Sequence, residues 1–137
     1  MITDFLDAHA RHWKDAELLF NQRRFANADH LYGLSAECGL KHLMRAFGML
    51  VDEAGDLRNR RDKRHANTIR DRYESYRQGH ARGADYLLPN DFPFSNWDIN
   101  QRYAPQSLFT EPTVEPHRSG ARVVQELVNR ARLEGLV

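Results

Sequence analysis

Apolar side chains recur at steps of three and four residues over the first third of the chain, which is the spacing of one face of an α-helix. The pattern predicts a first helix over residues 3–23, with Thr3 as its N-cap, and a second over residues 27–52, with Asn27 as its cap. Residues 24–26 are too few to do more than turn the chain, so we expect an antiparallel hairpin. The repeating positions are Leu6, His9, Trp13, Ala16 and Phe20, then Tyr32, Ala36, Leu40, Leu43, Phe47 and Leu50.

Three small residues, Gly33, Ala36 and Gly39, follow one another at three-residue steps inside the second predicted helix. Glycine inside a helix costs up to about 1 kcal/mol relative to alanine. We therefore expect a compensating contact at these positions, and the close approach of the first helix is the natural candidate.

Two further helices are predicted in the second half of the chain. The third spans residues 65–78, and the last spans residues 116–134 with Pro116 at the first helical position, where proline is tolerated. Four helices predict an all-α fold, a four-helix up-down bundle that residues 1–137 form as a single domain.

A long segment rich in aromatic residues, 89–115, separates the third helix from the last. Six of the fourteen aromatic side chains lie in it or next to it. Because aromatic side chains at such density normally pack onto a core, we expect an ordered loop that folds across the bundle, with a helical turn near residues 96–102. The six are Tyr86, Phe92, Phe94, Trp97, Tyr103 and Phe109.

Composition excludes several classes of protein. A hydrophobic fraction of 41% can build a core, so the chain is not disordered throughout. The mean hydropathy of -0.73, without a long apolar run, argues against a transmembrane helix and a membrane partner. The start of the chain is acidic and amphipathic rather than a secretory signal, so the cytoplasm is the expected location. Cys38, the single cysteine, is interpreted as a core residue, and no cofactor motif is present.

The net charge of +1 hides a segregation of charge. Residues 56–82 carry nine basic and four acidic side chains, a balance of +5, which leaves -4 for the rest of the chain. A basic segment of this kind is the footprint expected for phosphate groups, although a solvated connector and helix face is the alternative interpretation. The residues expected to bind a nucleic acid or another anion are Arg61, Lys63, Arg64, Arg70 and Arg72.

Two pairs of side chains are candidates for a cleft. Glu37 and Lys41 have the favourable spacing of four residues for an ion pair on a helix. Arg102 and Tyr103 lie in the aromatic segment, where they either bind an anion or brace the loop.

A metal site is the less favoured interpretation of the two histidines of the first helix. His9 and His12 lie three residues apart, but the chain has no H-E-x-x-H motif and no Glu-x-x-His pair. We therefore interpret them as packing residues, and we expect no metal.

The second predicted helix resembles that of HEPN domains, which are small prokaryotic helical bundles. The resemblance is carried by Ala36, Glu37, Leu40, Lys41 and Leu43. Residues 65–76 are similar to a short helix that often begins with histidine in this group, and residues 102–105 (R-Y-A-P) are similar to a turn found ahead of the last helix. The resemblance implies a homodimer that acts on or with RNA, a nucleotide or a nucleotidyltransferase-type partner protein.

Some HEPN proteins are toxin ribonucleases of toxin–antitoxin pairs, and they cut RNA without metal through an R-x(4–6)-H motif. His65 with Arg58 or Arg60 matches that spacing, although the motif lies in a connector before the third helix rather than in the later helical part. His65 would then be the general base or acid, and the arginine would stabilise the charged phosphorane.

Three functions therefore remain open. The first is a HEPN-like binding module that contacts RNA, a nucleotide or a partner protein through the basic segment. The second is a metal-independent ribonuclease that uses the Arg–His pair. The third is a regulatory or small-molecule-binding helical protein of unrelated role, which would use the aromatic loop.

Overall fold

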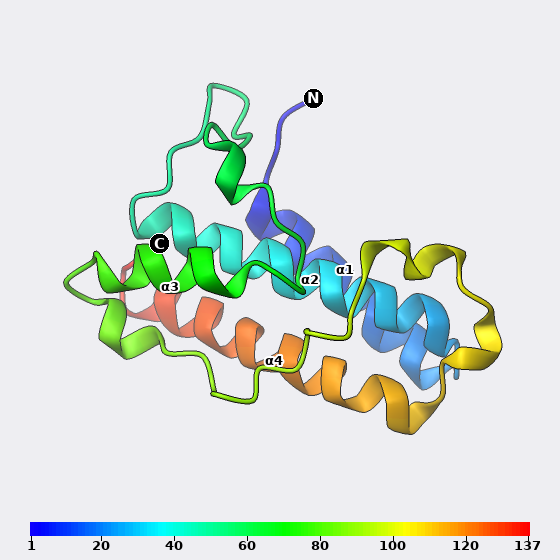
Figure 1. Cartoon of the computed structure of the whole chain (residues 1–137). Helices are drawn as coiled ribbons and strands as arrows, with labels where there is room; N and C mark the ends of the chain where they lie inside the picture. The colour runs from blue at the N-terminus through cyan, green and yellow to red at the C-terminus, as the bar shows by residue number, and fades with distance from the viewer.

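A computed structural model of residues 1–137 contains four α-helices (Figure 1). They are α1 (Phe5–Asn21), α2 (Phe25–Ala46), α3 (Arg70–Gln78) and α4 (Glu111–Leu133). The helices α1 and α2 form the expected antiparallel hairpin, and α4 packs against α2 and α1 (Figure 1). The only pairing of strand type is an isolated bridge between Val51 and Leu57. The prediction of an all-α four-helix fold is therefore confirmed.

A single cluster of 25 buried apolar residues forms the core. The helix α2 contributes most of its length to this core, and Tyr32, Leu40 and Leu43 are fully buried there. Val124 of α4 is equally buried. The helical periodicity of the sequence thus identified the core positions Tyr32, Ala36, Leu40 and Leu43 of α2 correctly.

The helix α2 is shorter than predicted, because it ends at Ala46 rather than at residue 52. Gly48 has a φ of +115°, a left-handed conformation that glycine adopts readily and that turns the chain out of the helix. Leu50 consequently lies outside the helix and is 63% exposed, so its assignment to the core was wrong.

The other helix ends also differ from the sequence prediction. The side chain of Asp4, not Thr3, caps α1 by accepting a hydrogen bond from Asp7 N at 2.9 Å. The helix α2 begins at Phe25, with Arg24 instead of Asn27 at the cap position. These shifts of two residues leave the buried face unchanged.

The last two helices begin at different places from those predicted. The helix α3 begins at Arg70, because residues 65–69 form a separate turn in which Thr68 N and Ile69 N both donate to His65 O at 3.0 Å. The helix α4 begins at Glu111, five residues early, and Pro116 lies inside it. Thr113 supplies the missing start signal, since its Oγ1 accepts from Thr110 N at 2.8 Å.

The aromatic loop between α3 and α4 is ordered and lies across the bundle, as expected (Figure 1). It contains the short 3-10 helices η3 (Ile99–Tyr103) and η4 (Gln106–Leu108). Trp97 is fully buried against Gly33 of α2, where an added Cβ would meet the indole at 1.9 Å. The absence of a side chain at Gly33 therefore makes room for Trp97 of the loop and not for α1. At Gly39 it makes room for His9 of α1 and Val124 of α4.

Candidate anion-binding site

Asp62 fixes the basic connector to α3. It lies in the 3-10 helix η1 (Arg60–Asp62) and is completely buried. One carboxylate oxygen accepts from Arg72 Nε at 2.9 Å, and the other accepts from Tyr76 Oη at 2.7 Å. The hydrogen bond to Asp62 raises the pKa of Arg72, and burial together with the same carboxylate raises the pKa of Tyr76. The connector is thereby held beside the start of α3.

This arrangement removes one negative charge from the surface and leaves most of the positive charge there. Asp62 is neutralised by Arg72, and Asp71 is the remaining carboxylate between residues 58 and 72. Six cationic side chains of the same stretch make no ion pair with any carboxylate of the chain. The six are Arg58, Arg60, Arg61, Lys63, Arg64 and Arg70, of which all but the half-buried Arg70 are exposed.

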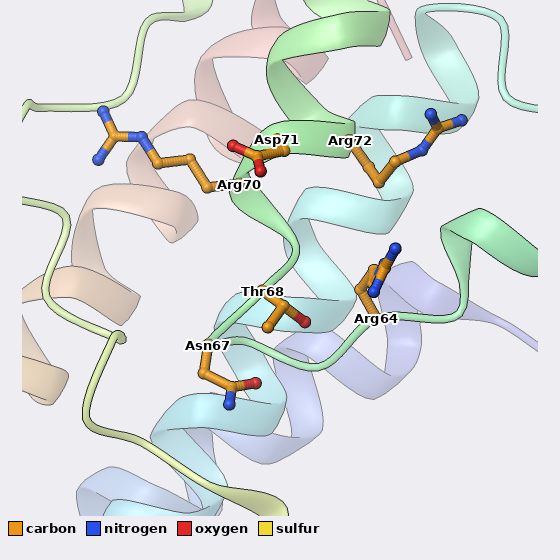
Figure 2. A pocket seen from close by; sticks show the side chains of 6 residues that line it. All are labelled: Arg64, Asn67, Thr68, Arg70, Asp71 and Arg72. Atoms are coloured by element: carbon orange, nitrogen blue, oxygen red, sulfur yellow. The ribbon is translucent and has the colours of Figure 1, made fainter.

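A hollow of about 440 Å³, which we call the basic pocket, opens at this segment (Figure 2). Figure 2 shows Arg64 and Arg72 extending on one side of the turn and Arg70 extending to the other side. No hydrophobic residue lines the pocket, and no side chain caps the start of α3. Its chemistry suits an anion, because three arginines and two uncharged polar side chains line it. The lining residues are Arg64, Asn67, Thr68, Arg70, Asp71 and Arg72.

A second hollow of about 430 Å³, the loop pocket, adjoins the first. The two share Asn67 and Arg70, and the loop pocket is completed by Ala66 and by residues 90–95 of the aromatic loop. Arg70 Nη1 donates to Asn90 O at 3.2 Å, which ties the start of α3 to that loop. The basic pocket therefore continues into a partly apolar one.

Glu37, Lys41 and His65 form a cluster beside the turn that precedes α3. Glu37 Oε1 lies 3.0 Å from Lys41 Nζ and 2.9 Å from His65 Nδ1. The side chains of Glu37 and Lys41 are 6% and 11% exposed, whereas that of His65 is 51% exposed. The predicted Glu37–Lys41 pair is confirmed, and His65 joins it with its Nε2 free of any protein partner.

The arginines predicted to act with His65, and the predicted Arg102–Tyr103 pair, make no hydrogen bond or ion pair with this cluster. The hydrogen bond of His65 goes to Glu37, and neither Arg58 nor Arg60 has a hydrogen bond or ion pair with it. The guanidinium of Arg102 lies 4.8 Å from the ring centre of Tyr103, in η3. The four residues expected to share a cleft thus form two separate pairs.

Burial governs the chemistry of the cysteine in α2 and of the two histidines in α1. Burial raises the pKa of the Cys38 thiol to about 12, so its nucleophilic thiolate form is scarce at neutral pH. His9 is buried, and its Nδ1 lies 2.7 Å from Ser35 O. Burial lowers the pKa of both His9 and His12. The structure contains no group of three side chains placed to ligate a metal.

Several residues that line the two pockets could not be predicted from the sequence. Asn67, Thr68 and Asn90 were not singled out, because amides and hydroxyls in turns are common and carry no motif. Phe92 was assigned to the aromatic loop, but nothing in the sequence indicated that it would lie beside the basic segment.

No helix of the structure has the length and apolar character needed to cross a membrane.

The fold and the site together define a helical bundle with a basic pocket at the start of its third helix. Comparison with protein families, with curated proteins and with solved structures gives no match to this chain.

Proposed function

We propose that this chain is a HEPN-like helical module that binds RNA through the basic segment and the basic pocket. The observation that carries the proposal is the set of six cationic side chains between residues 58 and 70 that have no carboxylate partner. Unpaired cations on one short stretch favour a ligand that presents phosphates at close intervals, because such a ligand releases counterions from each phosphate that is neutralised.

The resemblance to HEPN domains agrees with the burial of the residues that carry it. Ala36, Leu40 and Leu43 are fully buried in α2, and Glu37 and Lys41 are nearly so. The proposal includes the homodimer that the resemblance implies. Its mass in solution, measured by light scattering, is expected to be twice the 16.0 kDa of one chain.

The proposal is tested by the salt dependence of RNA affinity. The affinity of the protein for a labelled RNA of 12 nucleotides is measured by fluorescence anisotropy from 50 to 300 mM KCl. Each phosphate contact to a single strand contributes a slope of about -0.7 in log K against log salt. Arg61→Gln and Arg64→Gln are each expected to reduce the magnitude of the slope by about 0.7 and to weaken binding.

Arg132→Gln is the matched control, because Arg132 is an exposed arginine of α4 without an ion pair. It removes the same charge outside the basic segment, so it should leave both slope and affinity close to those of the wild type. Affinity that is independent of salt, or equal losses in all three variants, would contradict the proposal and would favour a protein partner instead.

A metal-independent ribonuclease is the second candidate, and the Glu37–His65 contact favours it. A carboxylate 2.9 Å from Nδ1 orients an imidazole so that Nε2 can take a proton. In this reaction His65 would remove the proton of a ribose 2′-hydroxyl. The 2′-oxygen would attack the adjacent phosphorus, and the bond from phosphorus to the 5′-oxygen would break. The 5′-oxygen would leave with a proton taken from solvent water, and His65 would afterwards return its proton to solvent. Arg58 or Arg60 would neutralise the phosphorane.

The ribonuclease candidate is tested by incubating RNA with the protein in EDTA. Cleavage to 2′,3′-cyclic phosphate ends, lost in His65→Ala and strongly reduced in Glu37→Gln, is the expected result. A preparation that binds RNA with the expected salt slope but leaves it intact would exclude this candidate and retain the binding module.

A further inference from the structure

The loop pocket adjoins the basic pocket, since Asn67 and Arg70 line both. One pocket is lined by polar side chains alone, with three arginines against one aspartate, and the other carries two phenylalanines, a proline, two asparagines and one aspartate. Each has the volume of an ordinary ligand site. A ligand that spans both must therefore carry an anion next to a flat, partly apolar group.

We infer that these two pockets together hold one unpaired nucleotide of the bound RNA, with its phosphate in the basic pocket and its base on Phe92 in the loop pocket. The inference rests on the proposed function and adds that the site accepts single-stranded rather than double-stranded RNA. It assigns the aromatic loop a direct part in binding.

Phe92 is suited to stacking because its ring is both accessible and held in place. It is half-buried, and its ring centre lies 5.1 Å from that of the buried Phe94 in an edge-to-face arrangement. Aromatic rings that are fixed from behind offer a stacking surface to a base at little cost in conformational entropy. Stacking requires a base that has left its helix, so the geometry selects single strands.

The polar groups around Phe92 can bind the edge of that base. Arg70 uses Nη1 for Asn90 O, which leaves its other N–H groups for a ligand at the junction of the two pockets. The side-chain amides of Asn67 and Asn90 make no hydrogen bond within the protein. Donors and acceptors are therefore available on both sides of the junction. A base within an RNA duplex has its edge already paired and cannot use them.

The experiment compares one RNA of 12 nucleotides, alone and annealed to its complement, with the wild type and with variants of Phe92. The single strand is expected to bind at least about tenfold more tightly than the duplex. Loss of one base stack weakens binding by roughly 5- to 150-fold, so Phe92→Leu and Phe92→Ala should lower the single-strand affinity by that factor. Neither should change the duplex affinity, and Phe92→Trp should retain the wild-type preference.

Tyr103→Ala is the control, because Tyr103 is 76% exposed in the same loop and lies outside both pockets. Phe92→Leu keeps an apolar side chain on Phe94, so thermal unfolding can verify that this variant folds. Equal affinity of Phe92→Leu and the wild type for the single strand, or an equal loss in Tyr103→Ala, would overturn the inference alone. A wild type that binds neither RNA, or binds without salt dependence, would instead overturn the proposed function.

Discussion

His117 Nδ1 lies 2.6 Å from Oδ1 of Asp29, although the two residues are 88 positions apart in the chain. The other imidazole nitrogen, Nε2, lies 2.8 Å from Asn96 Oδ1, and Gln101 Nε2 donates to Asp29 Oδ2 at 2.6 Å. Trp97 Nε1 donates to the backbone oxygen of Asp29 at 3.0 Å. One residue of α2 thus fastens the aromatic loop and α4 at the same place.

Asp29→Ala is expected to lower the free energy of unfolding by about 3 kcal/mol, because it leaves His117 and the amide of Gln101 without their buried partner. Urea unfolding monitored by circular dichroism measures this loss. The fluorescence of Trp97 should shift to longer wavelength in the same variant, since the loop that carries it loses its anchor.

Asp15→Ala is the matched control, because Asp15 is an exposed aspartate of α1 without a hydrogen bond. Its free energy of unfolding should lie within about 0.5 kcal/mol of that of the wild type. A loss of less than 1 kcal/mol in Asp29→Ala would show that the anchor contributes little to stability.

Gly33→Ala is expected to destabilise the protein by about 2–3 kcal/mol, although alanine favours a helix over glycine by up to about 1 kcal/mol. The added methyl group would overlap the indole of Trp97. Gly79→Ala provides the comparison, since its Cβ would meet nothing closer than 3.6 Å and its φ of -80° is open to alanine. Equal stability of the two variants in chemical denaturation would contradict the prediction.

Acidification is expected to destabilise the protein between pH 7 and pH 5 through His9. Burial lowers the pKa of His9 below the usual value of about 6.5, so the unfolded state binds the proton more readily. The stabilisation is therefore complete above pH 6.5 and decreases as the pH falls through that value, by at most about 1.4 kcal/mol per pH unit for one group. In His9→Gln the slope of the unfolding free energy against pH should be smaller, and an unchanged slope would refute the assignment.

Asp71→Asn is expected to raise the affinity for RNA by about two- to fivefold at low salt, because Asp71 is the one carboxylate that lines the basic pocket. The gain should shrink as salt is added. Glu126→Gln on α4 makes the same change of charge at an exposed position outside the pocket, so it should leave the affinity unchanged. A weaker complex in Asp71→Asn would mean that the carboxylate binds the ligand itself.

The fold class could be predicted from the sequence because the core positions of α2 and α4 follow the helical period. The ends of the helices could not, since they depend on single backbone conformations and caps. The left-handed conformation of Gly48 ends α2, and a threonine at position 113 starts α4 well before Pro116. In the sequence, the glycine at position 48 and the threonine at position 113 are weaker indications of a helix end than the periodic pattern that continues past them.

The candidate site was only partly predictable for a different reason. Local charge indicated the basic segment, and the spacing of four residues indicated the Glu37–Lys41 pair. The contact of His65 with Glu37 joins positions 28 residues apart, and Phe92 and Asn67, which line one pocket, are 25 residues apart. Such contacts follow from the tertiary packing of the connector and the aromatic loop, for which the sequence has no periodic signal.

The basic pocket is built from one continuous stretch, residues 64–72, whose nine positions divide between the pocket lining, the core and the contact with Glu37. Six line the pocket, Ala66 and Ile69 point into the core, and His65 contacts Glu37. Ligand preference and core packing are therefore encoded mostly at different positions of the same short segment, and Ala66 alone takes part in both. Exchanging this segment as a unit could change what the bundle recognises while its two core residues are retained, which makes it a natural place for specificity to diversify.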